Sequence, residues 1–136
     1  MGATIQATIA FFVLAYNVVI TGPATAQNYP TKPIRLIVPF PPGGGSDILA
    51  RILVPKLTET FKQSVVVDNR PGGGTTIGTE TALRASPDGY TLLLTSSSYA
   101  TNAALIKLPY DPVNDVSAIA LLGENGAVVA LHSSVP

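Results

Sequence analysis

Cysteine is absent from the 136-residue chain, and histidine occurs once, as His132. The lack of cysteine excludes a disulfide framework, a thiolate metal site and a cysteine nucleophile. A single imidazole also makes a histidine metal cluster or a Ser-His triad hard to build. His132 itself has no visible partner in the sequence, and we interpret it as a surface or strand-end residue.

Charged residues are also scarce, at 12% of the chain, and eight basic residues balance eight acidic ones. With no net charge, the protein lacks an overall field that would recruit nucleic acid or an anionic membrane surface. Hydrophobic residues make up 46%, which is enough for a core, and the length allows one domain at most. Any anion site must therefore be local.

No lysine or arginine precedes Lys32, yet the N-terminus has other features of an export signal. Residues 9–20 are almost wholly apolar, a run too short to span a bilayer as a mature helix. An A-x-A pattern at residues 24–26 then offers a cleavage site. We predict a signal peptide over residues 1–26, cleaved after Ala26, and hence an exported protein. An uncleaved anchor or a misassigned start codon is the alternative.

A glycine-rich motif occurs twice, as Pro42-Gly43-Gly44-Gly45-Ser46 and, 29 positions later, as Pro71-Gly72-Gly73-Gly74-Thr75. Consecutive glycines expose backbone N–H groups, and a helix just beyond adds its own free N–H groups and the positive end of its dipole. Such junctions attract anions, so we expect the two loops to face one small anion. A ligand-free turn is the alternative, but a plain turn needs one glycine rather than three.

Strand and helix patterns alternate around these loops. Strands are predicted at residues 34–38 (IRLIV), 64–67 (SVVV) and 91–95 (TLLLT), with helices over about 46–61 and 75–85 between them. Ser46 or Asp47 is expected to cap the first helix, and Pro55 to kink it or remove one of its backbone hydrogen bonds. This order predicts right-handed crossovers and a parallel sheet in an α/β fold. The loops after the strands then share one edge of the sheet, where ligands bind.

The pattern is less regular beyond the third strand. A polar loop is predicted over residues 96–102, whose hydroxyl and amide groups either bind a ligand or are simply solvated. Two more strands are expected at residues 119–122 and 128–131, around a turn at residues 123–126. Arg70, before the second glycine loop, either pairs with a carboxylate or is an ordinary exposed arginine.

The spacing of the glycines rules against nucleotide motifs. Neither loop has the lysine of a P-loop, and the fingerprint G-x-G-x-x-G meets Ile48 and Ile77 at its last position. No nucleophile, general base and orienting group occur together, so no enzyme activity is predicted. An α/β enzyme whose glycine loops hold a phosphate or nucleotide remains the alternative from another class.

Four stretches resemble the tripartite tricarboxylate transporter substrate-binding proteins, the Bug family of extracytoplasmic solute receptors. They are YPTKPIRLIVPFPPGGGSD (29–47), VVVDNRPGGGTTIGTE (65–80), SPDGYTLLLTSSS (86–98) and LPYDPVNDVSAIALL (108–122). The resemblance implies a periplasmic binding protein of the type II, Venus-flytrap fold. Such a receptor closes on a small carboxylated solute and delivers it to a membrane permease, without a cofactor or a nucleic-acid partner.

On this resemblance, residues 27–123 form part of the first lobe, and residues 124–136 begin the strand that crosses to a second lobe. Family members continue through that lobe, so we expect the chain to be an N-terminal fragment or a nonfunctional remnant of a receptor. Which carboxylate is bound, whether the chain folds alone and its oligomeric state are left open.

The resemblance also implies that loops after the first three strands bind a ligand carboxylate, largely through backbone N–H groups and bridging water. The predicted ligand-binding residues are Phe40, Gly43, Gly44, Gly45, Ser46, Asp47, Gly72, Gly73, Gly74, Thr75, Ser96, Ser97 and Asn102. For Asp47, a role at the helix start is the commoner alternative, and near an anion its carboxylate would have to point away.

Overall fold

A computed structural model describes residues 29–124 of the chain. The predicted signal peptide and the predicted strand at 128–131 lie outside the described residues. Residues 1–31 and 32–136 separate into two compact units, and the fold below is that of the second. Within the described residues, no helix is both long and apolar enough to cross a bilayer.

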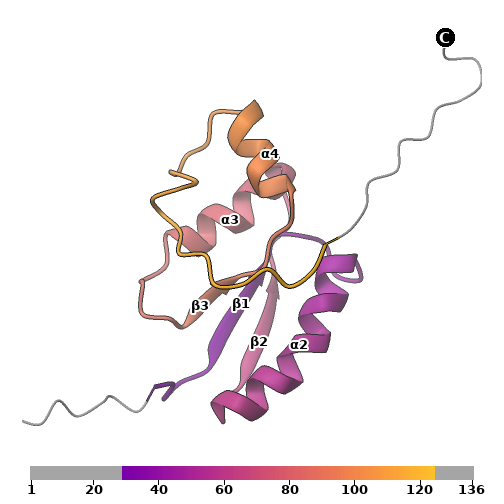
Figure 1. Cartoon of the computed structure of the whole chain (residues 1–136), viewed down its shortest axis with the longest axis vertical. Coiled ribbons are helices and arrows are strands. Elements are labelled where there is room, and N and C mark those ends of the chain that lie inside the picture. Colours follow the sequence, from indigo (N-terminus) through magenta and orange to yellow (C-terminus); the bar gives the residue numbers. More distant parts are fainter. Residues whose placement is uncertain (1–28, 125–136) are drawn as a thin grey trace, which may run out of the picture. The chain divides into compact units, whose positions relative to one another are not determined.

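Strands and helices alternate along the described chain (Figure 1). The elements are β1 (Ile34–Val38), α2 (Gly45–Phe61), β2 (Val65–Asn69), the 3-10 turn η1 (Gly73–Thr75), α3 (Thr76–Leu83), β3 (Thr91–Leu93) and α4 (Ser98–Leu105). The predicted α/β fold is confirmed, and the strand at 34–38 has the predicted bounds.

The three strands form one parallel sheet in the order β2-β1-β3. Ile34 pairs with Val65 of β2, and Leu36 pairs with Leu92 of β3, so β1 is the central strand. The path from β1 to β2 and the return to β3 run in opposite directions across the sheet. Because such crossovers are right-handed, α2 and α3 cover opposite faces of the sheet (Figure 1).

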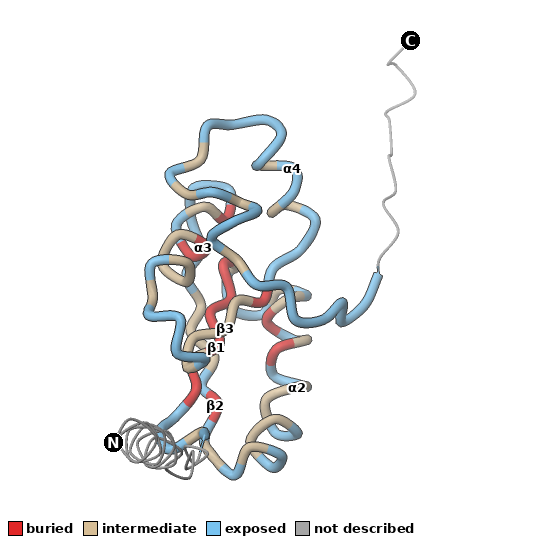
Figure 2. Tube along the Cα trace, turned by 60° about the vertical axis from the view of Figure 1, so that its left-hand side comes forward, coloured by how far each residue is buried: buried red, intermediate tan, exposed pale blue. Residues whose placement is uncertain are grey.

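The core lies on both faces of β1 (Figure 2). Ile34, Leu36 and Val38 share one face and pack with Ala50 of α2 and Val65 of β2. Ile37 points to the opposite face and is fully buried. Burial on both sides explains the almost unbroken apolar sequence of this strand. Each such side chain contributes about 1.5–3 kcal/mol to folding.

The start of α2 differs from the prediction. Its N-cap is Gly44, which makes no side-chain capping bond, and the helix begins at Gly45. Ser46 and Asp47 therefore lie inside the first turn, and the prediction that one of them is the cap is wrong. The helix runs through Pro55 to Phe61, and Lys62 ends it in a left-handed conformation (φ 53°).

The C-terminal part of the described chain corrects two predictions. The expected polar loop at 96–102 is largely helix α4, in which the Thr101 hydroxyl donates to the Ser97 carbonyl (3.1 Å). Its alanines favour helix once the first turn has formed. Residues 119–122 form no strand, and Ile119 is 81% exposed. A strand needs a neighbouring strand, and the described residues offer none at this segment.

Candidate functional site

The carboxyl ends of all three strands meet at one edge of the sheet, as the parallel order requires. Three segments leave this edge: the first glycine loop (Pro42–Ser46), the second glycine loop (Pro71–Thr75) and the serine turn (Ser96–Ser98) that opens α4. Backbone bonds tie the edge together, because Arg70 N donates to Val38 O and Leu94 N to Ile37 O, both at 2.9 Å. The strand order reverses between β1 and β3, the usual place for a ligand in open sheets.

The first glycine loop uses two of its N–H groups internally. Gly43, at φ +82°, donates to Asp47 Oδ2 (2.9 Å), and Gly44 donates to the Pro41 carbonyl (3.3 Å). The first intrahelical bond of α2 runs from Ile48 to Gly44. The N–H groups of residues 45–47 therefore have no intrahelical acceptor, and they carry the positive end of the helix dipole. An anion at this loop would meet the first turn of α2.

Asp47 points into the protein, with only 2% of the residue exposed. Its Oδ2 accepts from Gly43 N and from Arg51 Nε, both at 2.9 Å, and its Oδ1 accepts from Asn69 Nδ2 at 3.0 Å. The hydrogen bond from Arg51, followed by those from Gly43 and Asn69, lowers the pKa of this carboxyl to about 2, although burial opposes the shift. The carboxylate is thus ionised and occupied by internal donors.

Asn69, the last residue of β2, is a residue that the sequence prediction missed. Its Nδ2 donates to the Phe40 carbonyl (3.1 Å) as well as to Asp47. The Phe40 carbonyl, from the predicted ligand-binding set, is therefore engaged within the protein. The available signal was an amide side chain at the end of an apolar strand, next to the second glycine motif.

The second glycine loop has a different backbone. Gly72, Gly73, Gly74 and Thr75 all have positive φ, at 125°, 57°, 62° and 87°. Thr75 N donates to the Gly72 carbonyl (3.0 Å), which closes a tight left-handed turn ahead of α3. Glycine adopts this region freely, but a β-branched residue such as Thr75 does so only when its surroundings hold it there.

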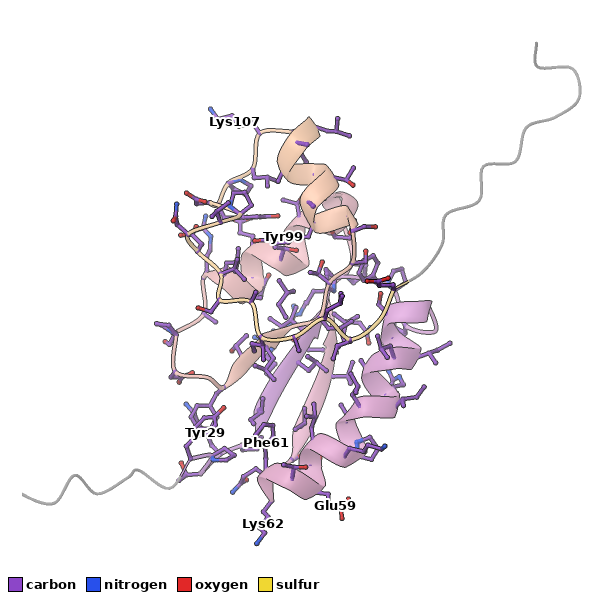
Figure 3. The ribbon with its side chains drawn as sticks, in the orientation of Figure 1. Tyr29, Glu59, Phe61, Lys62, Tyr99 and Lys107 are labelled. Carbon is purple, nitrogen blue, oxygen red and sulfur yellow. The ribbon has the colours of Figure 1, made fainter. Side chains whose placement is uncertain are left out.

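Contacts from α4 keep Thr75 in this conformation. Asn102 Nδ2 donates to the Gly74 carbonyl at 2.7 Å and lies 3.3 Å from the hydroxyl of Thr75. The Thr75 hydroxyl is also 3.5 Å from that of Ser98, which in turn lies 3.0 Å from Ser96 Oγ. Tyr99, labelled in Figure 3, fixes α4 to the following segment. Its ring stacks on that of Tyr110, with 6.3 Å between the ring centroids.

The predicted ligand-binding residues thus fall into two groups. Phe40 to Asp47 are tied to the end of β2, and Gly72 to Thr75 are tied to α4 through Asn102 and the serine turn. Among the described residues, no hydrogen bond joins the two groups directly. Ser97 contributes its carbonyl to α4 rather than a side-chain cap.

Arg70 already has a carboxylate partner. Its Nε donates to Asp68 Oδ1 (2.9 Å), and Arg35 donates to Asp68 Oδ2 (2.6 Å). Burial of Asp68 opposes its ionisation, but the bonds from Arg35 and Arg70 outweigh burial and lower the pKa of the carboxyl. Arg70 is therefore an ion-pair residue here. Within residues 29–124, no cluster of His, Asp and Glu side chains is arranged to hold a metal ion.

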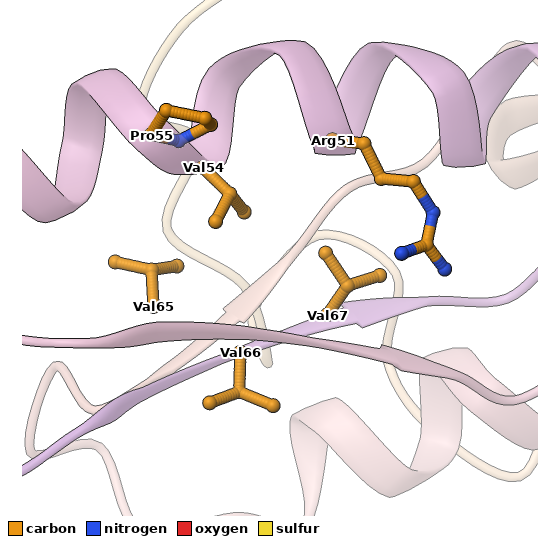
Figure 4. A pocket seen from close by; sticks show the side chains of 6 residues that line it. All are labelled: Arg51, Val54, Pro55, Val65, Val66 and Val67. Carbon is orange, nitrogen blue, oxygen red and sulfur yellow. The ribbon is translucent and has the colours of Figure 1, made fainter.

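A groove of about 450 Å³ lies elsewhere, between α2 and the edge strand β2 (Figure 4). Its walls are Arg51, Val54, Pro55, Val65, Val66 and Val67. None of these residues belongs to the glycine loops or the serine turn. The groove is therefore separate from the carboxyl edge of the sheet.

Comparisons with known proteins identify the family. Residues 49–136 match the family described as "Tripartite tricarboxylate transporter family receptor". Protein BugT of Bordetella pertussis is 41% identical over 121 residues, which cover 87% of this chain and 36% of BugT. The chain spans about a third of the length of the curated relatives it matches.

Solved structures give the same result for the fold. The periplasmic binding protein BugD is 42% identical, with a TM-score of 0.61 over 64% of this chain and 29% of BugD. MatC from Rhodopseudomonas palustris, solved with bound malate, is 32% identical, with a TM-score of 0.57 over 64% of this chain and 30% of MatC. The described sheet is thus part of a periplasmic-binding-protein fold. The chain belongs to the tripartite tricarboxylate transporter receptor family, whose members are solute-binding receptors.

Proposed function

We propose that this chain forms one wall of a carboxylate-binding pocket in an extracytoplasmic receptor of a tripartite tricarboxylate-type transporter. The observation that carries the proposal is the first turn of α2, whose N–H groups follow the first glycine loop at the carboxyl edge of the sheet. The side chain of Asp47 turns inward, so it does not block this turn. A carboxylate is one of the anions that such a donor set binds.

The ligand class follows from the size of the donor set and from the relatives. The free N–H groups of one helix turn suffice for a single carboxylate group, through hydrogen bonds worth about 1.5–3 kcal/mol each when one partner is charged. Two Rhodopseudomonas palustris relatives were solved with adipate and with malate. Both ligands are small aliphatic dicarboxylates. A compound of this class would place one carboxylate on this wall and the other on a wall supplied by a second lobe.

The remaining parts of the proposal concern the whole receptor. It would act in the periplasm after removal of the signal peptide, pass its solute to the membrane permease and perform no catalysis. The second glycine loop, Ser96, Ser97 and Asn102 would line the same pocket. An enzyme with phosphate-binding loops is less well supported, because neither glycine loop is followed by the lysine that cradles a nucleotide phosphate.

Calorimetric titration of the full-length protein with C4 to C6 dicarboxylates tests the proposal, using Gly44→Val as the variant. Gly44 has an ordinary φ of −75°, and an added Cβ meets only the Pro41 carbonyl, at 3.4 Å. The valine side chain therefore adds bulk at the loop without backbone strain. We expect affinity to fall roughly 10- to 100-fold, the loss of one charge-assisted hydrogen bond, with an unchanged unfolding midpoint.

Gly123→Val is the matched control, since an added Cβ there meets nothing within 4 Å and the residue lies outside the three loops. Its affinity should equal that of the wild type. Gly73→Val is a poorer probe, because the φ of +57° at this residue would strain any valine. Equal affinity of Gly44→Val and wild type, or saturable binding of a nucleotide in place of a dicarboxylate, would contradict the proposal.

A further inference from the structure

Two side chains hold the segment between β1 and the first glycine loop at both of its ends. At one end, Asn69 Nδ2 donates to the Phe40 carbonyl (3.1 Å). At the other end, Asp47 Oδ2 accepts from the Gly43 amide (2.9 Å). The two side chains also bind each other, Nδ2 to Oδ1, at 3.0 Å. One connected network therefore fixes the path of residues 40–43, which include two prolines that cannot donate hydrogen bonds.

This network spans two strands of the sheet. Asp47 lies in the first turn of α2, after β1, whereas Asn69 ends β2 and is separated from the second glycine loop by one residue. The Asn69 amide donates both of its hydrogens, one to the Phe40 carbonyl and the other to Asp47 Oδ1. A shift of the first glycine loop would therefore break its hydrogen bonds to the end of β2.

The charge of Asp47 makes its position notable. A carboxylate beside a site for another carboxylate repels the ligand and weakens binding unless the residue provides something that outweighs the repulsion. Its three donors occupy both oxygens, and nine-tenths or more of the side chain is buried. Asp47 thus has no oxygen turned toward a ligand, yet it determines where the Gly43 amide lies.

We propose that Asp47 and Asn69 are positioning residues, which hold the first glycine loop so that the first turn of α2 faces the ligand carboxylate. The role rests on the carboxylate-binding function proposed above. It replaces the prediction that Asp47 contacts the ligand, and it adds Asn69, which the sequence did not single out. Neither residue touches the solute; both act through the backbone of residues 40–43.

The change in affinity caused by one substitution has opposite signs if Asp47 positions the loop and if it acts only through its charge. Asp47→Asn keeps the shape of the side chain and removes a negative charge near the anion site. If Asp47 acted only through its charge, the variant would bind dicarboxylates more tightly. If Asp47 positions the loop, the amide, which has a single oxygen, cannot accept from both Gly43 and Asn69 as the carboxylate does, and affinity falls. We expect a fall of roughly tenfold, the scale at which groups that orient a site usually act.

Calorimetry with malate or adipate on the full-length protein measures this effect. Asn69→Ala should weaken binding to a similar extent, and it provides the second variant if Asp47→Asn does not fold. Arg51→Gln is the matched control, because it removes the exposed third partner of Asp47 and leaves the bonds to Gly43 and Asn69 in place. Its affinity should stay within about twofold of the wild type, because it leaves the backbone of residues 40–43 held as before.

A spectroscopic readout accompanies the titrations. The Gly43 amide proton, which donates to a carboxylate in the wild type, should move upfield in the NMR spectrum of Asp47→Asn, while amides of β1 stay in place. Equal or tighter dicarboxylate binding by folded Asp47→Asn and Asn69→Ala would overturn the positioning role. A wild-type protein that binds no dicarboxylate at all would instead overturn the proposed function, so the two failures are distinct.

Discussion

The two glycine loops share the motif Pro-Gly-Gly-Gly-Ser/Thr but not a conformation. The first has a single residue at positive φ, Gly43, and enters its helix directly at Gly45. The second has four such residues in a row and makes a left-handed turn before α3 begins. Three glycines permit both paths, because glycine has no Cβ to favour either. The conformation is therefore determined by what surrounds the motif.

The residue after each motif accounts for part of the difference. Asp47 follows the first motif and accepts the Gly43 amide, which favours early helix entry. Thr76 stands at the matching position after the second motif, and its hydroxyl makes no hydrogen bond within the described residues. The Thr76 hydroxyl therefore does not hold the second loop as Asp47 holds the first. The second loop instead depends on donors from outside, supplied by Asn102.

An asparagine braces each loop in a similar way. Asn69 donates to a carbonyl next to the first loop and to Asp47, and Asn102 donates to the Gly74 carbonyl and lies near the Thr75 hydroxyl. In both cases the asparagine comes from the next unit along the chain: the end of β2 holds the loop after β1, and the helix after β3 holds the loop after β2. Each glycine loop at this edge is thus stabilised by an asparagine that comes later in the sequence.

The largest expected effect on stability comes from a difference in how closely the two helices, α2 and α3, approach the strands. Leu49 of α2 packs its side chain on the core, whereas the matching residue of α3 is Gly78. A Cβ on Gly78 would lie 2.5 Å from the Arg70 carbonyl oxygen and 2.8 Å from Pro39 Cβ. Gly78→Ala should therefore push α3 away and lower the free energy of unfolding by about 1–3 kcal/mol, measured by urea denaturation.

Gly45→Ala is the control for this substitution, because an added Cβ at Gly45 meets nothing within 4 Å. Alanine is also the better helix former, so this variant should be neutral or slightly stabilised. Equal destabilisation of both variants would mean that the close approach of α3 is not what Gly78 provides. The two loop–helix units would then not differ in how much their stability depends on close approach of the helix to the strands.

Much of the fold was predictable from local patterns in the sequence. The strand at 34–38 is an apolar run bounded by prolines, and such signals need no knowledge of the partner strand. The parallel order then followed from the alternation of strands and helices. The common edge for the three loops was a consequence of that order, so the neighbourhood of the candidate site could be predicted as well.

Features that depend on distant residues could not be predicted. Residues 96–102 look like a polar loop in the sequence, but α4 begins at Ser98 and is anchored by Tyr99 on Tyr110 and by Asn102 on the second glycine loop. The left-handed turn of that loop depends on the same contacts. Asn69 acts through Phe40 and Asp47, which lie 29 and 22 positions away in sequence. No short-range pattern reports such pairs.

The second prediction is that the two loops respond differently to low pH, because among the described residues only the first loop is anchored by an ionisable group, Asp47. The pKa of Asp47 is about 2 in the folded chain, below its ordinary value of 3.8. Its contribution to stability is therefore fully present above about pH 4 and is lost as the pH falls toward 2, because the unfolded chain binds the proton first. The difference in unfolding free energy between wild type and Asp47→Asn should shrink over this range.

Asn102→Ala is the control for the acid series, since neither Asn102 nor the groups it binds ionise in this range. The difference in unfolding free energy between Asn102→Ala and the wild type should stay constant with pH. Other aspartates titrate in all three proteins and cancel in the comparison. A constant difference for Asp47→Asn as well would show that the first loop is not held by the ionised carboxylate.

The smallest expected effect concerns backbone strain at matching positions of the two motifs, Thr75 and Ser46. Thr75 has a φ of 87°, a region that glycine adopts freely and alanine does not, so Thr75→Gly should be about 1 kcal/mol more stable than Thr75→Ala. Ser46 lies in the first turn of α2, where the order should reverse, because glycine costs helices about 0.5–1 kcal/mol relative to alanine. Urea denaturation of the four variants measures both differences. The same order at both positions would mean that the two loops share a conformation after all.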